Sequence, residues 1–243
     1  MVRKLAYSVS QREHWISAAG GLVGMLAVLW ISHVLLNVQG AVVTVASMGA
    51  SAVLLFAAPH GALSQPWPVV GGHVISAIIG VACANWLGQD SVLAASTAVA
   101  LSIAAMYGTR SLHPPGGATA LLAVMGGDSV YSLGYGYVFS PVLLNVLLML
   151  AVAVAFNYPF PWRRYPQCWH RSLLERDARA SPVHAAEEKT MIPHSDLVYA
   201  LSQIDTFVDV SEEDLQRIYA LAMGHPHSAP EQPASALASQ TTN

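Results

Sequence analysis

The chain has 243 residues, of which 54% are hydrophobic and only 10% are charged, and its formal net charge is −3. Between His14 and Trp162 the only formally charged side chains are Arg110, Asp90 and Asp128. A soluble domain of this length needs a charged surface to stay dispersed, so a soluble domain is excluded for this stretch. Binding to nucleic acid would need a clustered basic face, and the sequence has none. We therefore predict a multi-pass membrane protein.

Six apolar segments follow one another in this stretch. They lie at Trp15–Val38, Ala41–Ala58, Val69–Gly88, Ser91–Gly108, Pro115–Gly126 and Gly134–Asn157. A transmembrane helix needs about 20 apolar residues, and four of the segments are long enough to cross as ordinary helices. Ala41–Ala58 is rich in Val, Thr and Gly at its start, whereas Pro115–Gly126 offers about 12 helical residues, or about 18 Å. The segment count by itself leaves four or six crossings open.

Basic residues flank the apolar stretch on both sides. They are Arg3, Lys4 and Arg12 before it, and Arg163, Arg164, Arg171, Arg176 and Arg179 after it. The positive-inside rule then places both termini in the cytoplasm, which requires an even number of crossings. We expect a multi-pass protein of the cell inner membrane that is surrounded by lipids, and a homo-oligomer is compatible with this arrangement.

A short internal repeat favours six segments. Residues 49–55, Gly-Ala-Ser-Ala-Val-Leu-Leu, match residues 117–123, Gly-Ala-Thr-Ala-Leu-Leu-Ala, at an offset of 68 residues. Each copy has one long apolar segment before it and another after it, so the core divides into two units of three segments. Because three is odd, the second unit is inverted relative to the first, as in many secondary transporters. We predict an all-α bundle of two inverted three-segment repeats, in which the middle segment of each is a half-helix.

The chain changes character after Pro159. We predict a transmembrane domain over residues 1–162, a cytosolic tail over 163–224 with short helices near 195–206 and 212–223, and a disordered C-terminus over 225–243. Ser211 and the three acidic residues after it are typical of a helix start. Leu215 and Tyr219 belong to the apolar face that follows at helical spacing. We expect a small helical hairpin that packs on the membrane domain, and regulation or partner binding is the alternative.

The two short segments offer a candidate anion site. A helix that begins within the membrane leaves its first N–H groups without intrahelical partners, and they carry a partial positive charge of about half a unit. Such a terminus binds an anion without any Lys or Arg. The candidate substrate-binding residues are Ser47, Met48, Gly49, Ala50, Ser51, Arg110, His113, Gly116, Gly117, Ala118 and Thr119. We expect no catalytic residue, no metal site and no cofactor.

The roles within this set differ. The glycines either let backbone approach a ligand or let helices pack closely, and the alanines favour packing. Ser51 and Thr119 occupy matching repeat positions and can donate hydroxyl groups. Arg110 is costly if buried and favourable if it faces an anion or the cytosolic mouth. His113 belongs to a residue type that titrates near neutral pH, so it could couple anion movement to protons.

Two further polar residues have ordinary interpretations beside functional ones. His73 follows two glycines near the predicted cytoplasmic end of the segment Val69–Gly88, so it either lines an entry path or caps a loop. Gln65 lies between Pro59 and Pro66, and we interpret it as a residue that organises a loop rather than one that contacts substrate.

Three separated motifs resemble one known family. Residues 113–122 (HPPGGATALL), 47–54 (SMGASAVL) and 64–73 (SQPWPVVGGH) are similar to the pattern of the HPP family of integral membrane proteins, over about residues 12–160. The family is usually described with four spans, from which the six-segment interpretation departs. Its plastid and cyanobacterial members are associated with nitrite transport, so the resemblance implies a transporter or channel for a small inorganic anion, most simply nitrite.

Two other classes of protein remain as alternatives. A membrane enzyme would need a metal set, a carboxylate pair or an activated nucleophile at one depth, and the apolar segments contain no Asp or Glu. The sequence therefore argues against an enzyme. A non-transporting scaffold or sensor that signals through the cytosolic tail would not need two broken helices, but it stays open.

Overall fold

The computed structural model describes residues 11–35, 38–168, 215 and 219. Within these ranges the chain forms helices and turns without any strand, which confirms the all-α class for this part of the protein. The predicted tail helices and the predicted disordered C-terminus lie outside the described residues, apart from Leu215 and Tyr219, which are both helical.

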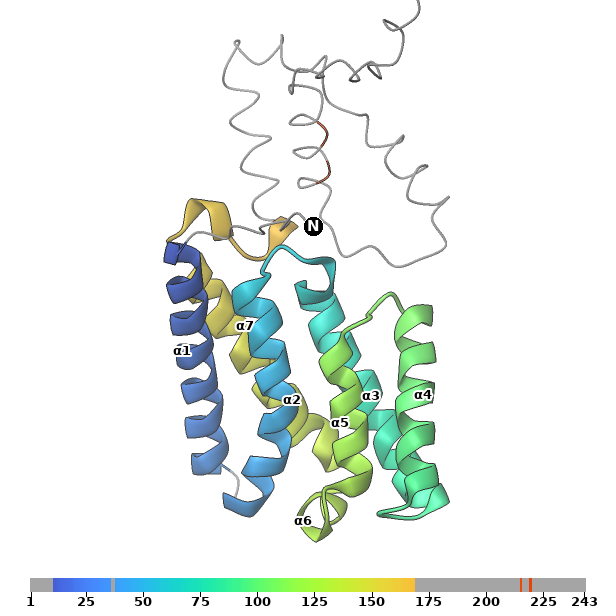
Figure 1. Ribbon diagram of the computed structural model, residues 1–243. Helices are drawn as coiled ribbons and strands as arrows, with labels where there is room; N and C mark the ends of the chain where they lie inside the picture. Colours follow the sequence, from blue (N-terminus) through green and yellow to red (C-terminus); the bar gives the residue numbers. More distant parts are fainter. Residues whose placement is uncertain (1–10, 36–37, 169–214, 216–218, 220–243) are drawn as a thin grey trace, which may run out of the picture. The chain divides into compact units, whose positions relative to one another are not determined.

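Six helices make up the described bundle and alternate in direction (Figure 1). They are α1 (Gln11–Leu35), α2 (Val38–Ala57), α3 (Pro66–Leu87), α4 (Val92–Gly108), α5 (Pro114–Met125) and α7 (Leu144–Asn157), with the one-turn α6 (Asp128–Tyr131) before the last. Within the described residues, Gln11–Val34, Pro66–Leu87 and Val138–Asn157 are long and apolar enough to cross a membrane. Residues 46–57, α4 and α5 are shorter apolar helices.

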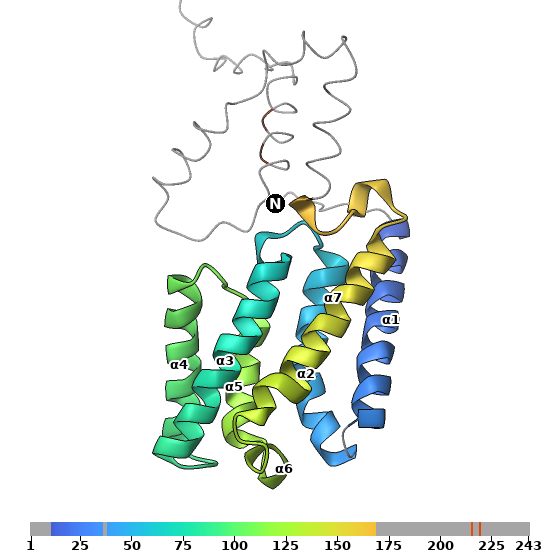
Figure 2. The ribbon, with the colours of Figure 1, turned by 180° about the vertical axis from the view of Figure 1, so that it is seen from behind.

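The helices pack as two sets of three. On one side α1 contacts α2 and α7, and on the other side α4 contacts α5 and α3 (Figures 1 and 2). The middle helices α2 and α5 contact each other between them. The two predicted sequence units are α1, α2 and α3, and α4, α5 and α7. Exchanging each helix for its counterpart in the other unit (α1 for α4, α2 for α5 and α3 for α7) leaves this list of contacts unchanged, as two equivalent units would require. The equivalence of the two units under an inverting axis stays a prediction.

The middle helices of the two units differ in length. α5 has 12 residues and begins at Pro114, which confirms the predicted short helix to within one residue at each end. The predicted half-helix in the first unit is wrong, because α2 runs for 20 residues from Val38 to Ala57 and Ser47 lies in its interior. The β-branched residues early in α2 lower helix propensity only slightly. In an apolar surrounding the backbone N–H and C=O groups must still be satisfied, and a continuous helix does this.

The last predicted segment is interrupted. Regular helix begins at Leu144 and is preceded by an irregular helical stretch, η2 (Val138–Leu143), in which Ser140 is extended with φ −136° and ψ 114°. Pro141 explains this break, because proline lacks an N–H and disfavours the α conformation of the residue before it. The span predicted for Gly134–Asn157 is therefore kinked at Ser140, and Val138–Asn157 is still long and apolar enough to cross a membrane.

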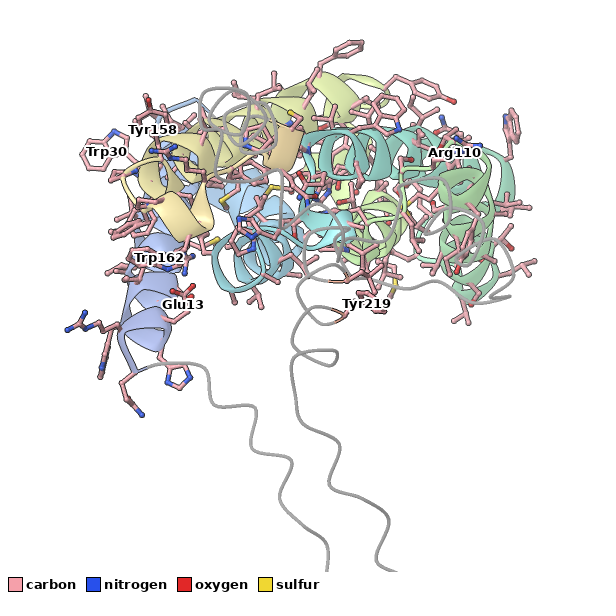
Figure 3. The ribbon with its side chains drawn as sticks, turned by 90° about the horizontal axis from the view of Figure 1, so that it is seen from above. Glu13, Trp30, Arg110, Tyr158, Trp162 and Tyr219 are labelled. Carbon is pink, nitrogen blue, oxygen red and sulfur yellow. The ribbon has the colours of Figure 1, made fainter. Side chains whose placement is uncertain are left out.

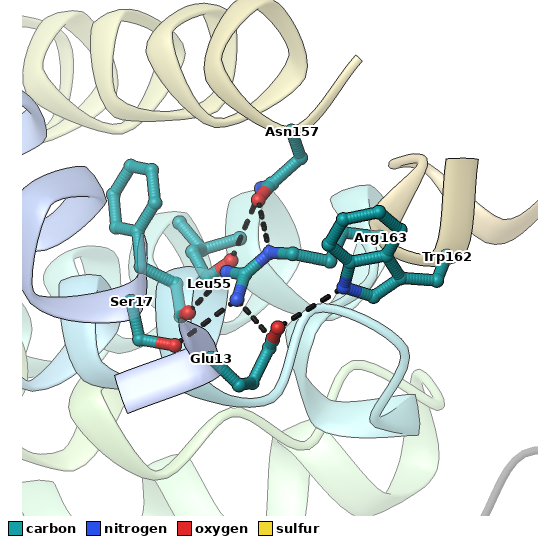
Figure 4. Close-up of polar contacts among 7 residues, drawn as sticks. Glu13, Ser17, Leu55, Asn157, Trp162 and Arg163 are labelled. Atoms are coloured by element: carbon teal, nitrogen blue, oxygen red, sulfur yellow. Dashed lines mark hydrogen bonds and ion pairs between the residues drawn. The ribbon is translucent and has the colours of Figure 1, made fainter. Parts of the chain in front are cut away.

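A buried arginine closes the end of the bundle where α1 begins (Figure 4). Arg163 is 1% exposed and forms an ion pair with Glu13 of α1. Its guanidinium also donates to Asn157 Oδ1 at 3.1 Å and to the Phe56 carbonyl. Asn157 Nδ2 in turn donates to the Leu55 carbonyl at 3.4 Å. Side chains from the end of α7 and the turn after it thus cap the last carbonyls of α2 and link three helices, so Arg163 is more than a solvated flank.

A tyrosine closes the opposite end. Tyr131 of α6 donates its hydroxyl to Asp90 Oδ1 at 2.8 Å and accepts from the Asp90 N–H at 3.1 Å. The same hydroxyl contacts the Val124 carbonyl at the end of α5. Burial, followed by the hydrogen bond to the Asp90 carboxylate, raises the pKa of Tyr131. These contacts tie the α3–α4 turn to the end of α5.

Candidate functional site

Four buried polar side chains meet where α2, α3 and α5 come together. Ser51 belongs to α2, His73 to α3 and Thr119 to α5, and His113 is the residue that caps the start of α5. All four are 0% exposed. We call these four residues the histidine–hydroxyl cluster. Buried polar groups in a membrane bundle are costly unless they are paired. Ionisable residues buried there are therefore candidates for a functional site.

Ser51 lies between the two imidazole rings. Its Oγ is 2.8 Å from His73 Nε2 and 3.0 Å from His113 Nε2. The carbonyl of Ser47, one turn earlier in α2, is a more distant acceptor at 3.3 Å for the same hydroxyl. One hydroxyl therefore joins histidines from two other elements.

The far nitrogen of each ring has a partner of its own. His73 Nδ1 lies 2.7 Å from Thr119 Oγ1, and His113 Nδ1 lies 2.9 Å from the carbonyl of Leu63 in the short turn η1 (Ala62–Ser64). The two rings are in edge contact, with centroids 5.0 Å apart. Every ring nitrogen in the cluster is thus within hydrogen-bond distance of one oxygen.

The carbonyl at one end of this chain fixes the proton positions when both rings are neutral. Leu63 can only accept, so His113 Nδ1 carries its proton and His113 Nε2 accepts from the Ser51 hydroxyl. Ser51 Oγ then accepts from His73 Nε2–H, and His73 Nδ1 accepts from the Thr119 hydroxyl. All four hydrogen bonds point in one direction, from Thr119 to Leu63, and every donor among them has an acceptor.

Close backbone packing between α3 and α5 holds the two histidines in place. A Cβ atom added at Gly116 would lie 2.6 Å from the Gly72 carbonyl oxygen, and one at Gly72 would lie 2.6 Å from His113 Cβ. Further along, a Cβ at Gly80 would lie 2.6 Å from the Ala120 carbonyl oxygen. Small residues let helix backbones approach in this way in membrane bundles. The contact brings the start of α5 against α3 immediately next to His73.

The start of α5 lies inside the bundle but exposes few N–H groups. Gly116 packs against Gly72, which lies about 9 Å along the axis of α3 from its first residue, Pro66. The start of α5 therefore lies further into the bundle than the start of α3. Its first two residues are Pro114 and Pro115, which have no N–H, and the Gly116 N–H donates to the His113 carbonyl at 2.8 Å. Three of the first positions therefore offer no free donor to an anion.

The other predicted site residues fall into two groups. On α2, Ser47 and Met48 are buried, whereas Gly49 is half-buried with open space around it and Ala50 is exposed. On α5, Gly117 and Ala118 are half-buried, and the nearest atom to a Cβ at Gly117 is Val99 Cγ1 of α4 at 3.9 Å. The structure thus brings Ser51, His113 and Thr119 together and places the Ser47 carbonyl beside them, whereas Gly49, Ala50, Gly117 and Ala118 are half-buried or exposed.

Arg110 is not part of the cluster. It is exposed, has φ 53° in the turn between α4 and α5, and lies beside α4 at the rim of the bundle (Figure 3). The same figure shows Glu13 and Trp162 at the other side of the bundle. Arg110 therefore lies at the exposed edge of the bundle rather than in its interior. Gln65 donates to the carbonyls of Pro59 and Gly61, which confirms that it organises a loop.

Sequence reasoning gave His73 only a peripheral role. It is the residue that joins the hydroxyls of the two repeat copies, Ser51 and Thr119. A signal was present in the spacing of Gly72, Ser76 and Gly80, which recur every four residues and mark the face of α3 that packs on α5. His73 lies next to that face in sequence, and it is fully buried in the structure.

The described residues contain no group of three or more His, Cys, Asp or Glu side chains that could hold a metal ion. The cluster has two imidazoles and two hydroxyls, which bind and pass protons and donate hydrogen bonds. Fold and site together define a polytopic helical membrane protein with a buried cluster of histidines and hydroxyls. The model of the family described as "HPP, transmembrane region" matches residues 6–166, and the chain belongs to this HPP family.

Two curated relatives are transmembrane proteins of Dictyostelium discoideum. One is 37% identical over 159 residues, which cover 64% of this chain and 50% of the relative. The other is 39% identical over 130 residues, which cover 52% of this chain and 45% of the relative. The chain therefore spans about half the length of the curated relatives it matches. No solved structure matches the chain.

Proposed function

We propose that the protein transports a small inorganic monovalent anion across the membrane and that the histidine–hydroxyl cluster is its binding site, with nitrite as the first candidate. The observation that carries the proposal is the complete burial of Ser51, His73, His113 and Thr119 at the junction of α2, α3 and α5. Association with nitrite comes from the family resemblance, whereas the choice of the cluster comes from geometry.

The cluster suits an anion because of its donors. Imidazole N–H groups and hydroxyls supply directed hydrogen bonds, and in the described residues their partners are each other and backbone carbonyls. An anion that enters can accept from Ser51 and from a ring N–H in place of these internal bonds. A hydrogen bond to a charged acceptor contributes about 1.5–3 kcal/mol, so two or three of them hold an anion without trapping it.

This site replaces recognition by two opposed half-helix termini. Because α2 is continuous, its N–H groups at Ser47–Ser51 are inside a helix, and α5 begins with two prolines. The positive end of the α5 dipole still lies beside His113 and favours negative charge there. Side chains rather than backbone then provide the donors.

Anion flux into proteoliposomes tests the proposal, with vesicles lacking protein as background. We expect saturable nitrite uptake by the wild type and its loss in Ser51→Ala, which removes the hydroxyl that joins both rings. Ser102→Ala is the matched control, because Ser102 is also buried and its Oγ has no hydrogen-bond partner in the described part of the chain. Equal losses in both variants, or saturable flux of a cation but of no anion, would overturn the proposal.

We further propose that the end of the bundle with Arg163 faces the cytoplasm of a cell with an inner membrane. The basic flanks on both sides of the apolar stretch support this orientation. Alkaline phosphatase fused after Pro166 should be inactive, and the same enzyme fused in the α3–α4 turn at Gly88 should be active. The reverse pattern would refute the orientation without affecting the transport proposal.

A further inference from the structure

We infer that the chain of hydrogen bonds from Thr119 to Leu63 conducts a proton, so that each anion moves together with a proton. The inference rests on the proposed transport function and adds the coupling ion. Its basis is continuity: the successive donor–acceptor distances are 2.7, 2.8, 3.0 and 2.9 Å, from Thr119 through His73, Ser51 and His113 to the Leu63 carbonyl.

The order of the groups suits proton transfer. An imidazole accepts a proton on one nitrogen and releases another from its second nitrogen, and a hydroxyl between two rings can do both at once. Here Ser51 Oγ faces Nε2 of both rings, so the outer nitrogens are left as entry and exit. Either a ring or a hydroxyl occupies each position from Thr119 to His113 without a gap.

One transfer can be written with all atoms balanced. A proton binds His73 Nδ1 after the Thr119 hydroxyl turns away, and the ring passes its Nε2 proton to Ser51 Oγ. The original Ser51 proton moves to His113 Nε2, and His113 releases its Nδ1 proton when water replaces the Leu63 carbonyl. One proton has entered and one has left. Both rings then carry the opposite tautomer, and turning of the rings and the hydroxyl restores the first state.

The chain of hydrogen bonds also has a direction in the fold. It begins in the interior at Thr119, whose own carbonyl accepts from the buried Tyr137 hydroxyl at 3.2 Å. It ends near the surface at the half-buried Leu63, in the turn between α2 and α3 at the end of the bundle where α1 begins. Among the described residues, the titratable members of this chain of hydrogen bonds are His73 of α3 and His113 before α5, and Tyr137 before η2 contacts it. From α2 the contributing group is the Ser51 hydroxyl.

Coupling of one proton to one monovalent anion makes transport electroneutral. The test uses the full chain in proteoliposomes with a pH-sensitive dye inside, and nitrite, nitrate and formate are added in turn under a fixed membrane potential. We expect nitrite addition to acidify the lumen above the background of protein-free vesicles and expect the nitrite flux to be independent of potential. Nitrite flux that depends on potential and leaves the lumen pH unchanged would overturn the relay and keep the transport proposal.

The other outcomes separate the two proposals as well. Acidification with formate or nitrate but not nitrite overturns the choice of nitrite and supports the relay, whereas no protein-dependent flux or pH change with any anion overturns both. His113→Gln keeps a donor and an acceptor but cannot carry a proton, so the number of protons per anion should fall to background. The wild-type ratio in His113→Gln would refute the relay. Ser102→Ala should keep that ratio, and a loss of coupling there would contradict the inference equally.

Discussion

Exchange of Gly116 for alanine tests whether close packing of α3 and α5 builds the site. A Cβ at Gly116 would lie 2.6 Å from the carbonyl oxygen and 2.9 Å from the carbonyl carbon of Gly72, and 2.9 Å from Ser76 Oγ. Two of these three atoms are backbone, so relief requires movement of a helix rather than of a side chain. Overpacking of this kind costs about 1–3 kcal/mol. We expect Gly116→Ala to lower stability by that amount.

The neighbouring glycine provides the control. The nearest atom to a Cβ at Gly117 is 3.9 Å away, so Gly117→Ala meets no steric barrier and gains up to about 1 kcal/mol of helix propensity. Thermal unfolding of both variants in the same detergent, followed by the loss of monodisperse protein on size exclusion, measures the difference. Gly116→Ala should unfold several degrees below the wild type, and Gly117→Ala at or above it. Equal midpoints for the two variants would refute the packing argument.

Two further perturbations address the ends of the bundle. Arg163→Met removes the donor from the buried Asn157 amide oxygen and the Phe56 carbonyl and should cost about 1–3 kcal/mol of stability in the same assay. Arg164→Met should cost less than about 1 kcal/mol, and similar losses would contradict the capping role. Tyr131 has a raised pKa in the folded protein, so its stabilising contribution is complete below the ordinary tyrosine pKa and is lost as pH rises through the folded value. Tyr131→Phe should therefore flatten the fall of the unfolding midpoint at alkaline pH, and an unchanged profile would argue against the link to Asp90.

Some of the fold and site was predictable from residue types alone. Pro114 and Pro115 fix the start of α5, because proline is accepted in the first turn of a helix and not later. The repeat placed Ser51 and Thr119 at matching positions, and both now contact His73. The short length of α5 was predicted from the bounds of its apolar segment, Pro115–Gly126. Local chemistry was sufficient for these features.

Features that depend on a partner elsewhere in the chain were not predictable. Arg163 lies among other arginines, and only the approach of Glu13 and the α2 carbonyls shows that it is buried. The β-branched start of α2 suggested a broken helix, yet an apolar surrounding enforces a continuous one. The break at Ser140 is different, because it arises from the proline that follows it and was therefore predictable from local sequence.

The deeper reason is that lipid and protein interior are equally apolar. In a soluble helix the hydrophobic stripe shows which face is buried, but α3 is apolar all round and its periodicity carries no such information. What distinguishes the inward face is the absence of side-chain bulk at Gly72 and Gly80 and the presence of a polar group at His73. Small residues on one face draw a neighbouring backbone close, and a polar residue beside them must then find partners on that neighbour. Once α5 packs on α3, Thr119 and the histidine at the start of α5 are the partners within reach, and α2 supplies Ser51 between the two rings. The same close contact that stabilises the bundle therefore assembles the site.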